Sequence, residues 1–260
     1  MILFVAAATP YVWLVRAGYN HQVSPWISVP LQAVLTFVLF TPNHDASHSS
    51  ISRKYRWLND AIGWLSALSL LGVFPPFRWI HLQHHKYTNH PEKDPDHYAG
   101  SGDPRFRVFR WLTQDMYYYY FYFQNRHERP RGEVVLAFAS MIGIHLTIGW
   151  LLLNGYFWDT VLHLLLPKMI GLTWLVYAFD YAPHHPHDHN LRENPYLVTN
   201  RLTGLFCVDD GISLAFPLLN QHLHNIHHLY QQVPFYRYHL IWKKHEKEFI
   251  AAGTPSSSLF

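Results

Sequence analysis

Three clusters of histidines carry the most distinctive chemistry that this sequence could perform. His44 and His48 are four residues apart, and two further clusters repeat the spacing i, i+3, i+4. These are His81, His84 and His85, followed by His224, His227 and His228. On an α-helix such positions lie on one face, so each cluster presents its imidazoles along a single stripe. A lone histidine in an apolar helix is usually a packing residue. Three clusters with eight imidazoles favour two metal ions.

The donor set narrows the choice of metal. Imidazole suits zinc, copper, iron and nickel. Structural zinc sites commonly use cysteine, but the only cysteine here is Cys207, which leaves no internal disulfide and no cysteine-held iron–sulfur cluster. A pair of redox-active iron ions fits the number and type of ligands best. Zinc and manganese stay open, because imidazole alone does not select the metal.

Residues close to the clusters could complete or orient the site. His184 and Asp180 are four residues apart at the end of an apolar segment. We expect His184 to be a ninth ligand. Asp180 could bind through water or hydrogen-bond a ligand, or it could instead be a helix-end carboxylate in the membrane interface. Four polar side chains could accept the outer N–H of a ligating imidazole, or could instead cap helices and turns: Asp45, Asn89, Asp94 and Asp96. His185, His187 and His189 follow Pro183 and are expected at the surface.

The elements that position these residues are predicted to be membrane helices. The chain has 260 residues, of which 14% are charged, against about 25% in soluble domains. Four apolar segments could cross a bilayer, at residues 2–18, 26–41, 134–153 and 157–181. The sequence therefore predicts one all-α integral membrane domain over residues 1–260, built on two helical hairpins. The net charge of +3 is small, and nothing indicates nucleic-acid binding.

A fifth apolar stretch, residues 61–74, ends at a Pro-Pro pair and is short for a crossing. We expect an interfacial or re-entrant helix there. A full crossing would put the first two histidine clusters on opposite sides of the membrane, where they could not share a metal centre.

The distribution of basic residues predicts the orientation. Of the 20 lysines and arginines, only Arg16 and Lys168 lie outside residues 43–133 and 181–260. The positive-inside rule then places both basic regions, both termini and all three clusters in the cytoplasm. The two-metal site would lie in a helical cap formed by residues 43–133 and 181–250. The serine-rich tail, residues 254–260, is expected to be loose.

Several longer segments resemble a known family. They are HDASH (44–48), FPPFRWIHLQHHKYTN (74–89), DPDH (94–97), FDYAPHHP (179–186) and NQHLHNIHHLYQQVPFYRY (220–238). Together they resemble the membrane fatty-acid desaturase-like superfamily of non-haem di-iron enzymes. Within it they are most similar to the cyanobacterial-type β-carotene hydroxylases, with the carotenoid ketolases next. The resemblance implies two iron ions held by nine ligands: His44, His48, His81, His84, His85, His184, His224, His227 and His228.

The resemblance also implies a reaction. With O₂ as cosubstrate, the enzyme would oxidise C–H bonds of an apolar lipid that enters from the membrane, most simply by hydroxylating a β-carotene-type ring. The alternatives are an acyl-lipid desaturase or hydroxylase and a carotenoid ketolase. Two electrons per turnover must come from an external donor, for which ferredoxin is expected. A basic face could steer an acidic donor, and its residues would be Arg53, Lys54, Arg56, Arg105, Arg107 and Arg110.

Two other classes of protein fit less well. A metal transporter would place polar ligands near the middle of its spans, whereas these clusters lie at span ends or outside. A di-haem electron carrier would need histidine pairs within the spans, and only His145 and His163 lie there.

Overall fold

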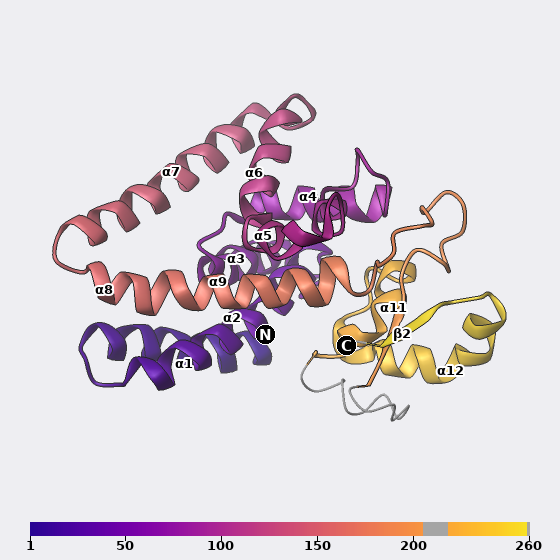
Figure 1. Cartoon of the computed structure of the whole chain (residues 1–260), viewed down its shortest axis with the longest axis horizontal. Coiled ribbons are helices and arrows are strands. Elements are labelled where there is room, and N and C mark those ends of the chain that lie inside the picture. The colour runs from indigo at the N-terminus through magenta and orange to yellow at the C-terminus, as the bar shows by residue number, and fades with distance from the viewer. Residues whose placement is uncertain (205–217, 259–260) are drawn as a thin grey trace.

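The computed structural model describes residues 1–204 and 218–258, and Cys207 lies outside them. These residues are mainly helical (Figure 1). In chain order, the helices are α1 (Ile2–Tyr19), α2 (Pro25–Ser47), α3 (Arg56–Ala67), η1 (Leu68–Leu70), α4 (Phe74–Tyr87), η2 (Pro95–Ala99), η3 (Pro104–Phe106), α5 (Arg107–Leu112), α6 (Gln114–Gln124), η4 (Arg126–Glu128), α7 (Arg131–Leu153), α8 (Phe157–Thr160), η5 (Val161–Leu165), α9 (Leu166–Leu175), η6 (Val176–Tyr181), η7 (Gln221–Leu223), α11 (His224–Leu229), η8 (Phe235–Arg237) and α12 (Tyr238–Ala251). The segments η5 and η6 are π-helical.

Within the described residues, four helical segments are long and apolar enough to cross a membrane, at the four predicted places. They are α1, α2, α7 and the continuous helix Phe157–Tyr181, which runs from α8 to η6. The second segment does not end at residue 41 as predicted. It accommodates Pro42 and continues to Ser47, so His44 lies in its last turn. Proline is tolerated in such helices where neighbouring helices pack around the freed carbonyl.

Helix α2 is the centre of the bundle, with α1 on one side and α9 on the other (Figure 1). Gly171 of α9 allows close approach, since a Cβ atom there would lie 2.9 Å from Cγ2 of Thr36 on α2. The predicted second hairpin is not closed. Helix α7 diverges from α8 and α9 after their connection (Figure 1), and among its residues only Ala137 is buried.

The segment from α3 to α4 is sharply bent rather than straight. The two helices meet at 95°, where Leu71 has the left-handed φ of 53°, and Pro75 and Pro76 start the next helix. His48 precedes this segment and His81 lies near its end, yet their Nε2 atoms are 2.7 Å apart. The chain therefore returns to the depth at which it started, which is the geometry of a re-entrant segment.

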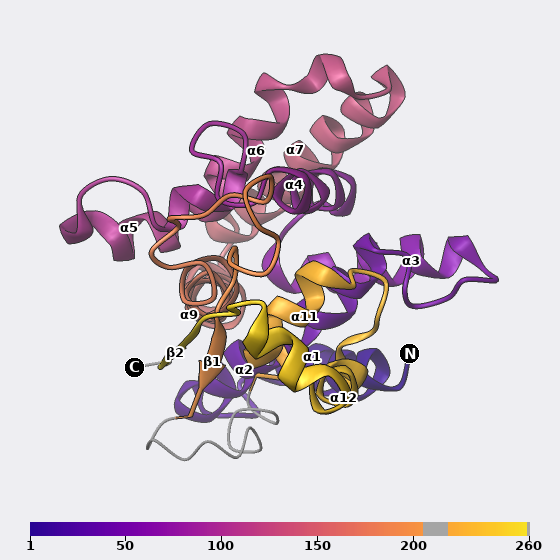
Figure 2. The same cartoon turned by 90° about the vertical axis from the view of Figure 1, so that its right-hand side faces the viewer.

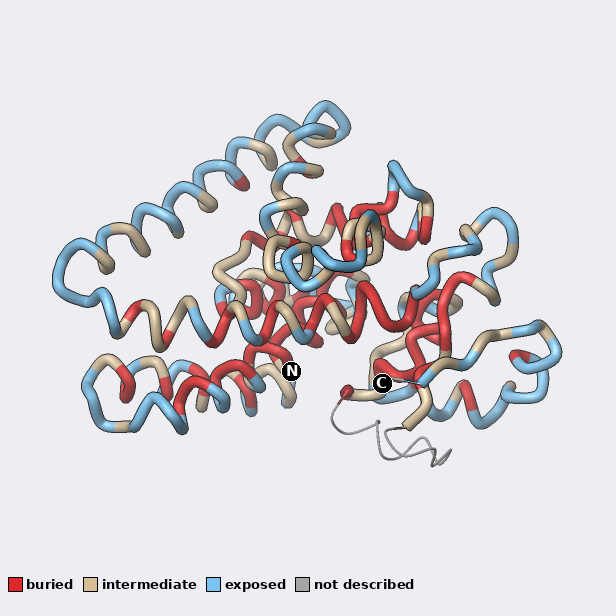
Figure 3. Tube along the Cα trace, viewed as in Figure 1, coloured by how far each residue is buried: buried red, intermediate tan, exposed pale blue. Residues whose placement is uncertain are grey.

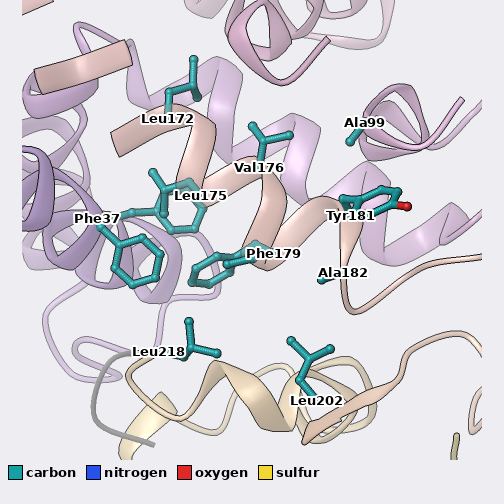
Figure 4. Packing of buried hydrophobic residues seen from close by; sticks show 12 residues of the cluster. Phe37, Ala99, Leu172, Leu175, Val176, Phe179, Tyr181, Ala182, Leu202 and Leu218 are labelled. Atoms are coloured by element: carbon teal, nitrogen blue, oxygen red, sulfur yellow. The ribbon is translucent and has the colours of Figure 1, made fainter. Parts of the chain in front are cut away.

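The buried residues are concentrated where α2, α4, α9 and α11 converge (Figure 3). Figure 2 views the molecule from this end, with α11 and α12 toward the viewer. The largest apolar cluster joins Phe37 of α2, Leu175 of α9 and Phe179 of η6 to Leu202 and Leu218 (Figure 4). The histidines are therefore supported by a packed apolar cluster.

A short strand pair departs from the all-α prediction. Strands β1 (Arg201–Thr203) and β2 (Ser256–Ser258) pair in parallel, and the Arg201 N–H donates to the carbonyl of Pro255 at 2.8 Å. The prediction that the tail is loose is wrong for Ser256–Ser258, because backbone pairing holds residues whose side chains carry no apolar signal.

Candidate metal centre

The nine predicted histidines converge at the end of α2. They form two groups, in each of which one nitrogen per ring lies within 4.8 Å of all the others. The first group is His44, His48, His81, His85 and His227. The second group is His84, His184, His224 and His228. The groups adjoin, since the ring centroids of His85 and His228 are 4.4 Å apart.

Each histidine triplet serves both groups. From α4, the i, i+4 pair His81 and His85 belongs to the first group, while His84 at i+3 belongs to the second. From α11 the assignment is reversed, because His224 and His228 join the second group and His227 joins the first. This division explains why both triplets carry three imidazoles: positions i+3 and i+4 diverge by about 100° around a helix, so one helix can reach two adjacent centres.

The contacts between the rings fit a cation. Six Nε2 to Nε2 separations lie between 2.7 and 3.2 Å. Where Nδ1 carries the proton of a neutral imidazole, its Nε2 presents only a lone pair. Lone pairs converging at these distances repel one another unless a cation lies among them. Both nitrogens of His184 are buried without a hydrogen-bond partner among the described residues, so one of them could bind a metal ion.

Outer contacts favour that tautomer for four rings. With Nδ1 protonated, His84 donates to Asp94 Oδ1 at 2.8 Å, and His227 can donate to the Tyr238 hydroxyl at 3.0 Å. In the same way His224 faces Gln221 Oε1 at 3.3 Å, and His228 faces Thr88 Oγ1 at 3.4 Å. Such contacts orient metal ligands and leave Nε2 directed inward.

Three of these outer partners were missed by the sequence analysis. Thr88 follows His84 by four residues and Gln221 precedes His224 by three, so helical spacing could have found them. Tyr238 comes from the separate helix α12, and no local spacing indicates it.

The four predicted outer partners have different surroundings. Asp94 contacts His84 and also accepts the backbone N–H of Asp96 at 2.9 Å, so it caps the turn and orients the ring at once. Asp96 Oδ2 lies 3.4 Å from the same Nδ1. Asp45 lies 3.5 Å from His44 Nδ1, which has no hydrogen bond among the described residues. Asn89 contacts none of the nine rings, and its Oδ1 lies 3.0 Å from Nδ1 of His187.

The prediction that His187 lies at the surface is therefore wrong. Its ring is half-buried, stacks at 6.1 Å on His184, and leaves Gly100 no room for a Cβ atom. His185 and His189 are exposed, as expected.

Burial sets the protonation of most rings. It lowers the pKa of His48, His81, His85, His184, His224, His227 and His228 well below the ordinary value. These rings are therefore neutral near pH 7, as metal ligation requires. His84 is the exception. Burial opposes its charge, but the carboxylates of Asp94 and Asp96 outweigh burial and raise the pKa of His84 to about 9. The two carboxylates thus attract a positive partner to this ring, either a proton or a metal ion.

Asp180 lies beside the groups and belongs to neither. The Tyr118 hydroxyl donates to Asp96 Oδ1 at 2.7 Å and lies 3.2 Å from Asp180 Oδ2. Tyr118 comes from the aromatic run 117–123 within α6. Three oxygen-bearing side chains from α6, η2 and η6 therefore meet next to His84, and two of them, Asp96 and Asp180, are buried.

Two cavities adjoin this cluster. A small one, with an empty volume of about 260 Å³ that includes open solvent, is lined by rings of both groups and by Asp96, Tyr118 and Asp180. A larger one, with an empty volume of about 720 Å³ that also includes open solvent, is mainly apolar and lies between α4, α6 and α9. Both are lined by Phe40, Phe77, Tyr118 and Asp180. An apolar molecule in the large cavity would therefore end against the small cavity that faces the histidines.

Comparison with known proteins agrees with this geometry. The family model described as fatty acid desaturase matches residues 23–259. The chain is 28% identical to the sn-2 acyl-lipid omega-3 desaturase (ferredoxin), chloroplastic, of Helianthus annuus, over 93% of this chain and 58% of that protein. It is 30% identical to the zeaxanthin 4-ketolase of Chlamydomonas reinhardtii, over 62% of this chain and 32% of that protein.

A shorter match, with 48% identity over 79 residues, links the chain to a delta(12) fatty acid desaturase of Caenorhabditis elegans, covering 30% of this chain and 18% of that protein. These matches cover less than two thirds of the length of each of these relatives. The family match covers most of the chain, including all three histidine clusters and three of the four apolar helices, all but α1. It confirms the superfamily resemblance. The chain is a membrane protein of the fatty acid desaturase family.

Proposed function

We propose that this chain uses two iron ions and O₂ to oxidise C–H bonds of an apolar lipid. The observation that carries the proposal is the convergence of nine histidines into two adjoining groups at the end of an apolar cavity. Each group would hold one ion. When bound, the iron pair would supply the activation of O₂ that organic side chains alone do not provide.

The leading reaction is hydroxylation of a carotenoid ring. One oxygen atom of O₂ enters the C–H bond as a hydroxyl group. The other leaves as water after taking up two electrons and two protons. The similarity of segments 74–89 and 220–238 to β-carotene hydroxylases supports this reaction, and so does the apolar cavity, whose Leu172, Leu175 and Val176 can pack on a hydrocarbon ring.

A second reaction is acyl-lipid desaturation. It is favoured by the match to the Helianthus annuus acyl-lipid desaturase, which covers 93% of this chain. Here two hydrogens leave the substrate, and both oxygen atoms leave as water. A ketone, as the name of the 4-ketolase relative suggests, would follow from repeated oxidation at one carbon. All three outcomes use the same site, and they differ in which C–H bond the cavity holds next to the small cavity.

The side chains around the small cavity have separate tasks. Phe40, Phe77 and Phe179 wall it and limit the entry of water. The Tyr118 hydroxyl holds a proton on its hydrogen bond to Asp96 Oδ1. Burial raises the pKa of Asp96 to about 6, although the positive charge of His84 opposes that rise, so this carboxyl group can take up a proton near neutral pH.

The electron donor and the orientation are part of the proposal. We infer ferredoxin as the donor, supported by the name of the Helianthus annuus relative. We infer that the metal site and both termini lie in the cytoplasm, supported by the basic residues of segments 43–133 and 181–260.

Metal analysis and product analysis test the proposal together. Protein purified from membranes and loaded anaerobically with ferrous iron should hold about two iron ions per chain. With reduced ferredoxin and O₂ it should convert β-carotene into a product with one added oxygen. Loss of two hydrogens from an acyl lipid would instead select the desaturase reaction. One zinc ion per chain, with no iron after reconstitution and no oxidised product, would contradict the proposal.

A further inference from the structure

One ligand differs from the other eight in exposure. Among the nine histidines, all of which the structure describes, eight are buried and His48 alone reaches the surface. It lies at the C-terminal end of α2. Its ring is nevertheless integrated into the first group, since its centroid is 4.7 Å from that of His81 and 4.8 Å from those of His85 and His227.

His48 opens into a wide polar hollow. The hollow has an empty volume of about 1220 Å³ that includes open solvent, and it lies between the α2–α3 connection, α3 and α4. Three arginines line it, Arg53, Arg56 and Arg78, against one aspartate, Asp60. Arg78 pairs with Asp60. Arg53 and Arg56 are exposed and make no ion pair with any residue in the described ranges 1–204 and 218–258. We call this surface the His48 hollow, and its uncompensated charge is positive.

The structure divides the basic residues that the sequence grouped together. Arg53 and Arg56 line the His48 hollow, and Lys54 lies between them in the chain. Arg105 pairs with Asp103 in both side-chain and backbone contacts, and Arg110 donates to the Asp103 carbonyl at 3.2 Å. Neither of these lines the hollow. Of these residues, only Arg53 and Arg56 therefore place free positive charge in a hollow that a candidate ligand also lines.

We propose that the His48 hollow is the docking site of the electron donor, an acidic one-electron carrier protein, and that electrons enter through the His48 ring. This inference rests on the oxidase function proposed above. Positive charge around the hollow would attract an acidic partner and orient its redox centre toward His48, the one ligand that reaches the surface.

The route from the hollow to both groups is short. His48 Nε2 lies 2.7 Å from His81 Nε2, within the first group. His85 of that group has its ring centroid 4.4 Å from His228 of the second. Two carrier molecules dock in succession, and each is oxidised by one electron. The two electrons, with two protons from solvent, reduce the oxygen atom that leaves as water, so the hydroxylation described above is balanced.

Charge reversal tests the docking site. The variant Arg53→Glu/Arg56→Glu is compared with wild type and with Arg105→Glu/Arg126→Glu. The control makes the same change in net charge at exposed arginines outside the hollow. All three are prepared as full-length, iron-loaded protein in discs of uncharged phosphatidylcholine, and circular dichroism verifies their fold. A plant-type [2Fe–2S] ferredoxin is the probe, and calorimetry measures its binding at low and high salt.

The hollow variant should bind ferredoxin roughly tenfold or more weakly at low salt and should lose most of its salt dependence. The control should stay within about twofold of wild type, as expected for charges outside the contact. Carbodiimide should couple Lys54 of wild type to ferredoxin carboxylates, a bond located by mass spectrometry. Equal binding by the hollow variant and wild type would overturn the proposal.

Two further measurements separate the possible failures. Dithionite, a small reductant that needs no docking site, should support equal product formation by wild type and the hollow variant. If wild type forms no product with dithionite, the oxidase function fails, and ferredoxin binding to the hollow is judged separately by calorimetry and coupling. If instead the hollow variant loses binding to vesicles of anionic lipid while keeping ferredoxin binding, the arginines serve lipid headgroups and the docking proposal is wrong.

Discussion

At the scale of single residues, the Tyr118 hydroxyl is the protein group best placed to serve the reaction. It lines both cavities and donates to Asp96 at 2.7 Å. We expect Tyr118→Phe to keep its iron and its fold but to lower kcat by roughly 10²-fold, the usual lower bound for losing a positioned proton donor. Tyr117→Phe is the matched control, because Tyr117 instead stacks on Tyr98 at 4.2 Å. Equal turnover of Tyr118→Phe and Tyr117→Phe would show that this hydroxyl has no part in the reaction.

The Asp94 carboxylate makes a second prediction at this scale. It orients His84 and raises its pKa, so it strengthens the hold of this ring on a cation. Asp94→Asn should weaken iron binding about 10–100-fold, as loss of an outer partner of a metal ligand usually does. Competition with a chelator, followed by iron counting, measures the change. Asp103→Asn removes an exposed carboxylate outside the site and should leave iron affinity unchanged. The same affinity in both variants would rule out this role for Asp94.

Sequence spacing predicted which residues converge on the metal centre, but it could not predict which of the two groups each histidine joins. Spacing on a helix places i, i+3 and i+4 on one face, so the eight clustered histidines could be named from the chain alone. His184 could be named from its place at the end of an apolar segment. The assignment of His84 and His227 to opposite groups depends on how α4 and α11 are rotated about their axes, which only tertiary packing sets. Tyr118 and Tyr238 were missed for the same reason, since each reaches the site from a helix distant in sequence.

At the scale of elements, the contact between α2 and α9 positions the first ligand. A methyl group at Gly171 would lie 2.9 Å from Thr36 Cγ2 and 3.2 Å from the Ala33 carbonyl. Gly171→Ala should therefore push α2 from α9, destabilise the protein by about 1–3 kcal/mol and lower its iron content. Gly149→Ala on α7 meets no atom within 4 Å and should be neutral. Thermal unfolding of the two variants measures the difference, and equal midpoints would show that the close approach is not needed.

The four apolar helices could be predicted because length and hydropathy suffice to recognise a span. Their packing could not, because apolar composition does not say which helix faces which. Helix α7 therefore diverges from α9, although a short connection predicted a hairpin. The predicted end of α2 at residue 41 was too early, because the helix passes through Pro42 and carries His44.

At the scale of the whole molecule, the site requires a particular orientation of every loop. Because His48 contacts His81, we expect the α3–α4 segment to return to its own side and only the four long helices to change sides. The connections at residues 20–24 and 154–156 must then lie opposite the histidine groups. We expect those connections to face away from the cytoplasm, because they contain no lysine or arginine.

Single cysteines introduced into a Cys207→Ser background test this orientation. An impermeant maleimide added to sealed, right-side-out vesicles should label Asn154→Cys but should label Ser52→Cys only after the membrane is opened. Asn154 is exposed and follows α7, while Ser52 lines the His48 hollow. Labelling of both positions from one side would mean that the α3–α4 segment crosses the membrane. The histidine groups could not then form as the structure has them, because His48 and His81 would be separated by the bilayer. The reverse pattern, with only Ser52→Cys labelled from outside, would keep the metal centre but remove the ferredoxin side of the proposal, since the carrier could not reach the His48 hollow.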